Sequence, residues 1–382
     1  MIRRSFAVAL ATALLPLSAH AADLLQVYEM ARNGDPQLSA AESTRLVDKE
    51  GAVQARAALL PQINGQATLN RTRSEPNADI NSGSFTNKRR NYTIDGSQTL
   101  FNWTQINNLR SQRELSKAAD FTLESANDSL IVRTSAAYFN VLVAIESLNA
   151  AQTNEAAAKK QFDFASKRLE VGLAPITDVH EARAQYDSAR ANTILARNAV
   201  EDAYQALAEI TGQPVRDLKG LPQDFQPELP AARGVQDWVA SAVDNNPALK
   251  AKQFQLESSE ANVETARAGH WPTLYFGGQY SDRSSDGTST NNLTQASTDF
   301  ENESQSRSIG LTLRVPIFSG GATQSGVREA IARRDVTQDE YEQQKRALER
   351  NTRNAYQTLV AGVSEVEARR LALFSAQSAY DA

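Results

Sequence analysis

The chain has 382 residues, with 40 basic and 45 acidic side chains, a net charge of −5 and no cysteine. The acidic balance argues against a nucleic-acid partner, and without thiols only packing or oligomerisation can hold an exported fold together. Hydrophobic residues make up 41% and aromatic residues 7% of the chain. This composition suits long, closely packed helices and water-facing strands better than a large globular core.

Residues 1–21 have the features of a secretory signal peptide. A basic start precedes a short apolar run, and Ala19-His20-Ala21 forms a small-residue cleavage site. The run is too short to span a bilayer, so we expect cleavage and a mature chain that begins near Ala22. No later run approaches 18 apolar residues, so residence in a membrane would require a β-barrel.

The most informative feature is an internal duplication. Pro61 recurs as Pro272 at an offset of 211 positions, and Phe101 recurs as Phe318 at an offset of 217 positions. The extra residues of the second copy therefore lie in one loop. The predicted organisation is a first repeat at 22–212, a proline-rich linker at 213–233 and a second repeat at 234–382.

After two short helices, each repeat changes from a helical period to the period of two that is typical of strands. Strand pairs are predicted near 61–101 and near 271–318. The residues assigned to the lipid-facing side are Ile63, Leu69, Leu274 and Leu311, and those assigned to the water-facing side are Asn64, Thr68 and Thr312. Such alternation matches a transmembrane barrel, although a half-buried soluble sheet has the same period.

Two further features favour the barrel. Aromatic residues lie near the strand ends, as in an interfacial girdle; they are Trp103, Trp271, Tyr275 and Phe318. The segments Ser74 to Arg90 and Ser281 to Arg307 are long and polar, and we expect them to be loops. Proline cannot donate to a strand ladder, so Pro61, Pro272 and Pro316 are predicted at the bends between strands and helices.

Long helices are predicted to follow each strand pair. No Gly or Pro occurs between Gly96 and Gly172, which predicts a helix from Thr104 to Val171 with a length of about 100 Å. A helical hairpin at 104–211 follows, because apolar and small residues then recur at alternating steps of three and four from Val179 to Ile210. The second repeat has its long helix at 322–382.

Catalytic motifs are missing from the sequence. It has no thiol, no H-E-x-x-H motif, no nucleophile elbow and no Walker-type loop. His180 and His270 are too far apart in sequence to argue for a metal site. We therefore expect no enzymatic activity, no cofactor and no metal.

Several segments resemble one family. They are RLEVGL at 168–173, ITDV at 176–179, HWPTL at 270–274 and VPIFSGG at 315–321. These segments, and the duplicated order of helices and strands, are similar to TolC-type outer-membrane efflux and secretion channels, the outer membrane factor family. The resemblance is close and covers essentially the whole mature chain.

The resemblance implies an α+β membrane protein of the outer membrane that forms a homotrimer. Each protomer would give four strands to a twelve-stranded transmembrane β-barrel and its long coiled-coil helices to a periplasmic α-barrel. This passive channel-tunnel would serve as the exit duct of drug-efflux or type I protein secretion systems, with drugs or polypeptides as cargo. A periplasmic adaptor and an inner-membrane transporter would be its partners.

The resemblance also assigns roles at the turn of the first long hairpin. Val171, Gly172 and Leu173 match the tip that docks the adaptor, and Thr177 and Asp178 match positions that link this hairpin to the inner one and keep the entrance closed. Simple helix capping explains the same residues equally well, with Gly172 as a C-cap and Thr177 or Asp178 as an N-cap.

Two alternatives remain open on the sequence alone. A periplasmic adaptor also contains a long coiled-coil hairpin, but it would place that hairpin among small β-rich domains, and an adhesin stalk would show one uninterrupted coil. The second repeat is also shorter than the first after its long helix begins. We therefore expect the sequence to be C-terminally incomplete, without the hairpin that forms the gate in the family.

Overall fold

The computed structural model describes residues 21–74, 84–222, 225–229, 234–291, 294 and 296–381. The expected signal peptide, apart from its last residue, lies outside the described residues. The first elements are α1 (Leu24–Gly34), α2 (Pro36–Ala57), β1 (Gln62–Ser74), β2 (Ser84–Phe101), α3 (Trp103–Glu170) and α4 (Ile176–Thr211). The later elements are α5 (Val235–Asn245), α6 (Pro247–Arg267), the 3₁₀ turn η1 (Ala268–His270), β3 (Thr273–Thr290), β4 (Ser297–Arg314) and α7 (Ala322–Asp381).

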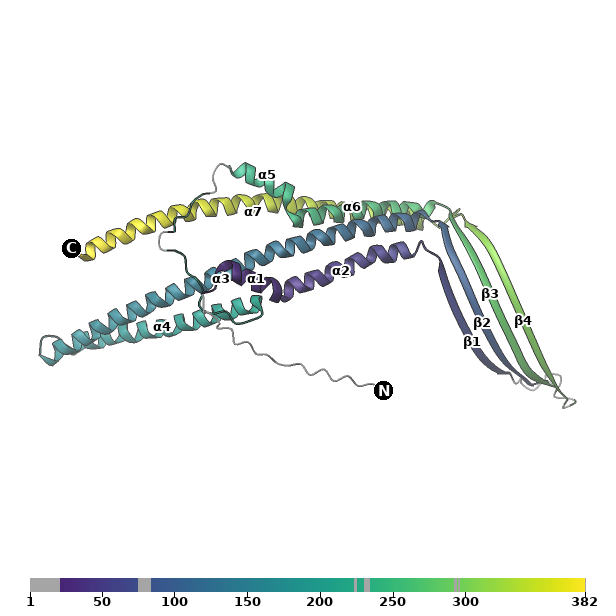
Figure 1. The fold of residues 1–382 in the computed structure, drawn as a ribbon, viewed down its shortest axis with the longest axis horizontal. Coiled ribbons are helices and arrows are strands. Elements are labelled where there is room, and N and C mark those ends of the chain that lie inside the picture. The colour runs from purple at the N-terminus through teal and green to yellow at the C-terminus, as the bar shows by residue number, and fades with distance from the viewer. Residues whose placement is uncertain are drawn as a thin grey trace, which may run out of the picture. The chain divides into compact units, whose positions relative to one another are not determined.

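The order of two helices, two strands and one long helix occurs twice along the chain. The four strands form one antiparallel sheet in the order β1-β2-β3-β4 (Figure 1). β1 and β2 belong to the first repeat, and β3 and β4 belong to the second. Within the sheet, the two repeats therefore meet at the β2–β3 pair. The described part is therefore mostly helical with a single four-stranded sheet.

Helix α3 is a continuous helix of 68 residues. Its length follows from the absence of Gly and Pro, the residues that most strongly disfavour a helix interior. It ends just before Gly172, whose φ of 75° lies in the left-handed region, a common way to end a helix because Gly has no Cβ to clash. The predicted helix from Thr104 to Val171 is therefore confirmed to within one residue at each end.

The strands are longer than the alternation of apolar residues predicted. β2 begins at Ser84, and β3 and β4 each contain 18 residues, so much of the two segments expected to be polar loops is strand. Residues 75–83 of the first expected loop lie outside the described residues. The ladder extends beyond the apolar region because backbone hydrogen bonds do not depend on side-chain polarity, and cross-strand polar and charged pairs replace the apolar ones.

The chain divides into two compact units, and α2 and α3 each contribute to both. The first unit comprises Met1–Ala40 and Ala126–Gln226, and the second comprises Ala41–Ser125 and Pro227–Ala382. The two units are described separately below.

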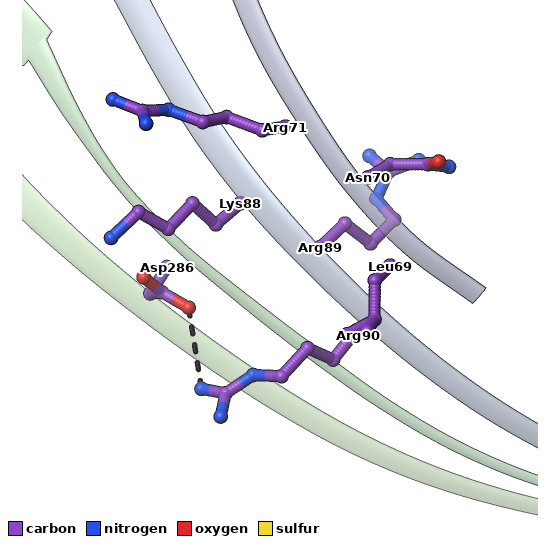
Figure 2. Close-up of a pocket in the computed structure, with 7 residues that line it drawn as sticks. All are labelled: Leu69, Asn70, Arg71, Lys88, Arg89, Arg90 and Asp286. Atoms are coloured by element: carbon purple, nitrogen blue, oxygen red, sulfur yellow. Dashed lines mark hydrogen bonds and ion pairs between the residues drawn. The ribbon is translucent and has the colours of Figure 1, made fainter. Parts of the chain in front are cut away.

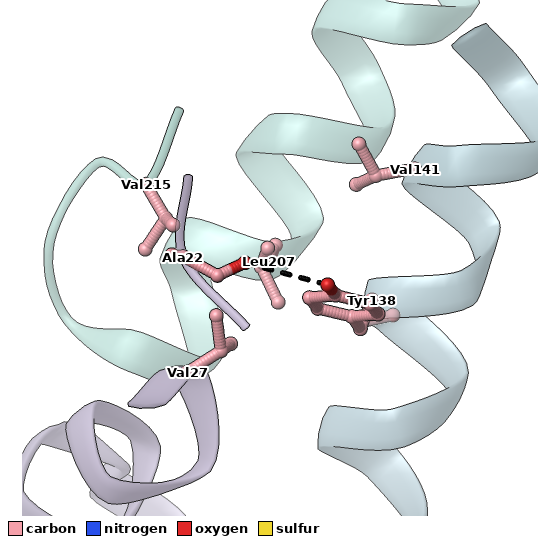
Figure 3. Packing of buried hydrophobic residues seen from close by; sticks show 7 residues of the cluster. Ala22, Val27, Tyr138, Val141, Leu207 and Val215 are labelled. Carbon is pink, nitrogen blue, oxygen red and sulfur yellow. Dashed lines mark hydrogen bonds between the residues drawn. The ribbon is translucent and has the colours of Figure 1, made fainter. Parts of the chain in front are cut away.

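The core of the first unit lies where α1, α3 and α4 meet (Figure 3). Val27, Val141 and Leu207 are fully buried there, each from a different helix. Four of the residues of α4 that recur at steps of three and four in the sequence are buried as well; they are Ala189, Thr193, Val200 and Leu207. Closer to the turn between α3 and α4, Phe162 of α3 stacks on Tyr186 of α4 with ring centroids 6.3 Å apart.

Part of the predicted linker packs against this core. The backbone of Ala22 donates to the carbonyl of Asp217 and accepts from the amide of Lys219, each at 2.9 Å. The hydroxyl of Tyr138 on α3 donates to the carbonyl of Lys219, and Val215 is buried. Proline content correctly excluded a helix here, but it carried no information about this packing.

A buried ion pair holds the junction of α1 and α2 against α3. Asp35, between the two helices, has a side chain only 2% exposed, and it accepts from both terminal nitrogens of Arg133 at 2.6 and 3.2 Å. It also accepts from the amide of Leu38, which caps α2. The hydrogen bonds from Arg133 lower the pKa of Asp35, so the carboxylate stays charged although it is buried.

Helices α2, α3, α6 and α7 pack in the second unit. Arg45 and Lys49 of α2 both form ion pairs with Asp120 of α3. Phe121 of α3 stacks on Phe254 of α6 at 5.4 Å. Lys252 of α6 pairs with Glu340 of α7 at 3.0 Å, and other polar contacts, such as that between the hydroxyls of Ser111 and Ser258, are buried.

One stretch of α3 is long and apolar enough, by composition alone, to cross a membrane, which differs from the expectation drawn from the sequence. Residues 130–141 of α3 pack partly inside the protein. Leu130, Tyr138 and Val141 are buried in the protein, and Arg133 forms the ion pair with Asp35. Packing within the single chain accounts for only part of this apolar character, because 22% of the stretch is buried and Ile131, Val132 and Val143 are exposed.

Candidate functional sites: the sheet surface and the hairpin tip

The sheet has one apolar and one polar face near the helices, and the strand register defines both. Ile63, Gly96, Gly278 and Ile309 form one cross-strand row, so these residues share a face. The large side chains on this apolar face are exposed in the single chain; they include Ile63, Leu69, Tyr92, Ile94, Phe276, Ile309, Leu311 and Leu313. The four residues assigned to the lipid-facing side from the sequence all lie on this face.

The opposite face is lined by polar side chains that bond to each other. Asn64 donates to Asp95 at 3.3 Å across β1 and β2. Across β2 and β3, the Ser281 hydroxyl donates to the side-chain amide oxygen of Asn91 at 3.1 Å, and the Ser285 hydroxyl donates to that of Asn87 at 2.7 Å. Thr68 and Thr312, assigned to the water-facing side, share this face through the register.

The apolar face becomes charged toward the strand ends that are far from the helices. Arg71, Lys88, Asp286 and Glu301 form one row there. The basic side chains of this region are Arg71, Arg73, Lys88, Arg90 and Arg307, and the acidic ones are Asp282, Asp286, Asp299, Glu301 and Glu303. Figure 2 shows a shallow depression at this border, where Arg90 pairs with Asp286 at 3.4 Å. On this face the charged ends of β1 and β2 are therefore basic, whereas those of β3 and β4 are acidic apart from Arg307.

Sequence analysis missed this charged region because it assigned the residues to loops. The signal was present, since Asp299, Glu301 and Glu303 alternate with neutral residues at the strand period. The charged region could have been predicted by following the alternation of every second residue beyond the last apolar residue of each strand.

Aromatic side chains cluster where the sheet meets the helices. Trp103 lies 6.3 Å from Trp271 and 6.5 Å from Phe101, measured between ring centroids. Phe318 is exposed in the segment between β4 and α7. Tyr275 does not share the apolar face, because its register partner is Thr312 and its hydroxyl accepts from Asn102 at 3.0 Å. Its inclusion in an aromatic girdle was wrong, since one position along a strand reverses the face.

The three prolines singled out in the sequence lie at strand ends. Pro61 precedes the first residue of β1, and Pro272 precedes the first residue of β3. Pro316 lies two positions after the last residue of β4. None interrupts the ladder, as expected for a residue without an N–H group.

The turn between α3 and α4 exposes apolar side chains. The exposed fractions of Val171 and Leu173 are 68% and 69%. The turn is held by backbone bonds, with the amide of Leu173 donating to the carbonyl of Arg168 at 2.8 Å and the Arg168 guanidinium donating to the carbonyl of Leu173 at 3.2 Å. Gly172 adopts φ 75°, which is the conformation of a helix C-cap. Among the described residues, no other part of the chain buries Val171 or Leu173.

Thr177 and Asp178 do not occupy the N-cap position. α4 begins at Ile176, its N-cap is Pro175, and no side chain caps it. Both residues lie in the first turn and are exposed, where the charge of Asp178 interacts favourably with the helix dipole. The alternative interpretation of Thr177 or Asp178 as an N-cap was therefore wrong. Capping explains Gly172 but not these two residues.

Comparison with known proteins gives consistent results. The sequence profile described as "Outer membrane efflux protein" matches residues 27–213 and 238–382. The chain is 31% identical over 366 residues to the outer membrane protein TolC of Escherichia coli K12, covering 95% of this chain and 73% of that protein. It is 26% identical to the alkaline protease secretion protein AprF of Pseudomonas aeruginosa, covering 96% and 75% of the two chains.

The fold also matches a solved structure. The CmeC outer membrane channel of Campylobacter jejuni superposes with a TM-score of 0.66 at 20% identity, covering 94% of this chain and 76% of that one. The family profile covers most of the chain, and the sheet, the long helices and the identity to TolC agree with it. The chain therefore belongs to the outer membrane efflux protein family.

Proposed function

We propose that three copies of this chain form a passive exit duct across the outer membrane. The observation that carries this proposal is the open four-stranded sheet with one apolar and one polar face. The apolar face would contact lipid, and the polar face would line a water-filled lumen. A four-stranded sheet has two open edges, which hydrocarbon does not tolerate, and single-chain barrels have about eight strands or more. Three copies would supply twelve strands.

The charged region supports a direction for the channel. Charged side chains are costly in hydrocarbon, so the lipid-facing band would end on each strand at its first charged residue, and the strand ends beyond would project from the bilayer. These residues are Arg71 on β1, Arg90 on β2, Asp282 on β3 and Arg307 on β4. The helices start at the other ends of the strands. They would extend into the periplasm as a tunnel, because the expected signal peptide directs export and the family resides in the outer membrane.

The hairpin turn at 171–173 would dock a periplasmic adaptor. The support is the exposure of Val171 and Leu173 at a turn whose backbone is already satisfied by internal hydrogen bonds. Exposed apolar side chains that are not needed for the local fold favour a contact surface. An inner-membrane transporter that supplies the energy would complete the assembly.

Thr177 and Asp178 would act at the entrance of the tunnel. Both are exposed in the first turn of α4, and neither is needed to cap that helix. The Thr177 hydroxyl donates to the Asp178 carboxylate at 3.5 Å, and the remaining oxygen of this exposed carboxylate could accept a bond from a neighbouring hairpin. The cargo would be drugs or other small toxic molecules, or polypeptides, the latter by analogy with the protease secretion named for AprF.

The experiment separates assembly from docking. The full-length protein is expressed in a strain that lacks its own exit duct, and we measure dye efflux, polypeptide secretion and the mass of the detergent-extracted protein. We expect a trimer that resists dissociation on unheated gels and restores export. Monomeric mass together with a soluble location would refute the proposal.

The adaptor contact is tested at one side chain. Leu173→Glu places a charge on the turn and should abolish export while the trimer mass is unchanged. Leu173→Met keeps an apolar side chain of similar size and should preserve export. Normal export by the Leu173→Glu protein would show that the turn does not dock a partner.

A further inference from the structure

The two edges of the sheet have no partner strand among the described residues. β1 pairs only with β2, and β4 pairs only with β3. The apolar side chains along both edges are exposed; Leu69 on β1 has an exposed fraction of 72% and Leu311 on β4 one of 63%. Because strand directions alternate across the sheet, β4 next to β1 of a second copy would continue the antiparallel order. A second copy is therefore the occupant that fits both edges.

Only certain registers keep the two faces of the sheet separate. Side chains alternate between faces along a strand, so a shift of one residue would place polar residues of one copy beside apolar residues of the next. The permitted registers between β4 of one copy and β1 of the next copy therefore differ by steps of two residues. Two observations choose the same one among them.

The first observation is the border between the apolar and charged parts of the outer face. The last apolar residue before the border is Leu69 on β1, Tyr92 on β2, Tyr280 on β3 and Ile309 on β4. These residues do not lie in one row. Ile309 shares its row with Ile63, which is six positions before Leu69. The border therefore moves by two residues at each of the three steps between strands.

On each side of a bilayer the boundary between hydrocarbon and water is a plane. The border between apolar and charged residues must therefore be continuous around a closed barrel. One more step of two residues, from β4 of one copy to β1 of the next, moves from the row of Ile309 to the row of Leu311. Leu69 of the next copy is the border residue of its own β1. The border is continuous when Leu311 lies opposite Leu69 of the next copy.

The second observation is the internal duplication, which is independent of polarity. Positions in β1 recur 211 residues later in β3, and positions in β2 recur 217 residues later in β4. The observed β2–β3 pairing is thus the internal counterpart of the pairing between β4 and β1 of the next copy. Ile94 pairs with Tyr280 in the structure. Its counterpart by the two offsets is Leu311 opposite Leu69.

We propose that β4 of each copy pairs with β1 of the next copy in the register that places Leu311 opposite Leu69. The proposal rests on the proposed trimeric duct and specifies its seam. The register also places Leu313 opposite Ala67 on the apolar face and Thr312 opposite Thr68 on the polar face. Arg307 and Arg73 come together beyond the apolar band, where water and salt screen like charges.

The absence of cysteine from this chain makes disulfide trapping a direct test. Leu69→Cys and Leu311→Cys are introduced together in the full-length protein, which is oxidised in outer membranes and then denatured without reductant. Residues directly opposite have Cβ atoms about 4.5–5.5 Å apart, whereas diagonal neighbours are about 7–8 Å apart. A disulfide needs about 3.5–4.5 Å, so small backbone motions suffice only for the opposite pair.

Matched pairs test the neighbouring registers. Leu311→Cys combined with Ala67→Cys, or with Arg71→Cys, corresponds to a slip of two residues in either direction. We expect the Leu69 pair to form covalent dimers and trimers about tenfold faster than either slipped pair, because only directly opposite positions are within reach. Thr68→Cys with Thr312→Cys should also form covalent oligomers, which confirms the register on the other face.

The outcomes distinguish the register from the proposed duct. Trimers that cross-link fastest through position 67 or 71 would overturn the register and leave the duct intact. A cysteine-free protein that is monomeric in the membrane would overturn the duct itself. Variants are compared only where reduced, unheated samples run as trimers, so a failure to fold cannot be mistaken for a wrong register.

Discussion

A lysine at Leu313 should destabilise the protein far more than a lysine at the adjacent Thr312. Leu313 lies within β4 on the apolar face beside Leu274, four positions from the border residue Ile309. Thr312 lies on the polar face beside Tyr275. A lysine on the lipid face at the bilayer midplane costs about 2–4 kcal/mol, and a lumen-facing substitution costs much less.

The expected cost corresponds to a fall of about 30- to 700-fold in the folded-to-unfolded ratio of each copy, at about 1.4 kcal/mol for each factor of ten. The assay is urea unfolding in phospholipid vesicles, followed by tryptophan fluorescence and by heat-dependent gel mobility. Leu313→Ala is the control for the loss of apolar contact without a new charge. Leu69→Lys should cost less than Leu313→Lys, because Leu69 borders the charged rows and a lysine there can reach water.

The face assignment would be refuted by equal stability of the Leu313→Lys and Thr312→Lys proteins. It would also be refuted if Leu313→Ala cost as much as Leu313→Lys, since apolar packing and not exclusion of charge would then be responsible.

Other predictions concern the first unit and the helices. Arg133→Met leaves the carboxylate of Asp35 buried without its partner and should lower the free energy of unfolding by about 3–5 kcal/mol; thermal unfolding should show partial recovery when Asp35→Asn is added, and no recovery would mean that the pair is not the cause. The depressed pKa of Asp35 means that its contribution is present above the unfolded-state pKa of about 3.9 and is lost as the pH falls through the lower folded-state pKa. Below the unfolded-state pKa, the Tm of the Asp35→Asn protein should therefore fall less steeply with decreasing pH than that of the unsubstituted protein. An equally steep fall of Tm in both proteins would contradict this. Gly34→Ala should destabilise clearly, because a Cβ there would clash with the backbone carbonyl oxygen of Thr211. Gly326→Ala in α7 meets nothing within 4 Å and should be neutral or stabilise by up to about 1 kcal/mol, so equal effects of the two changes would count against the close approach at Gly34.

The sequence alone determined features that depend on neighbours along the chain. The length of α3 follows from the lack of Gly and Pro between Gly96 and Gly172, because helix formation depends on local propensity and bonds four residues apart. The two faces of the sheet follow from a period of two, so Ile63 and Thr68 were assigned to opposite faces correctly. At the hairpin tip, the sequence located the turn through Gly172, because a helix ends where a left-handed residue is easily accommodated.

Only the tertiary structure decided features that depend on partners far along the chain. The strands continue into polar segments because each has a ladder partner there, and Tyr275 lies on the polar face because its partner is Thr312. The ion pair of Asp35 with Arg133 joins residues 98 positions apart, which no local period can reveal. The same limit explains why the sequence predicted a linker at Asp217 but not its packing beside Ala22. Local periods fix which way a side chain faces, whereas long-range pairing fixes what it meets there.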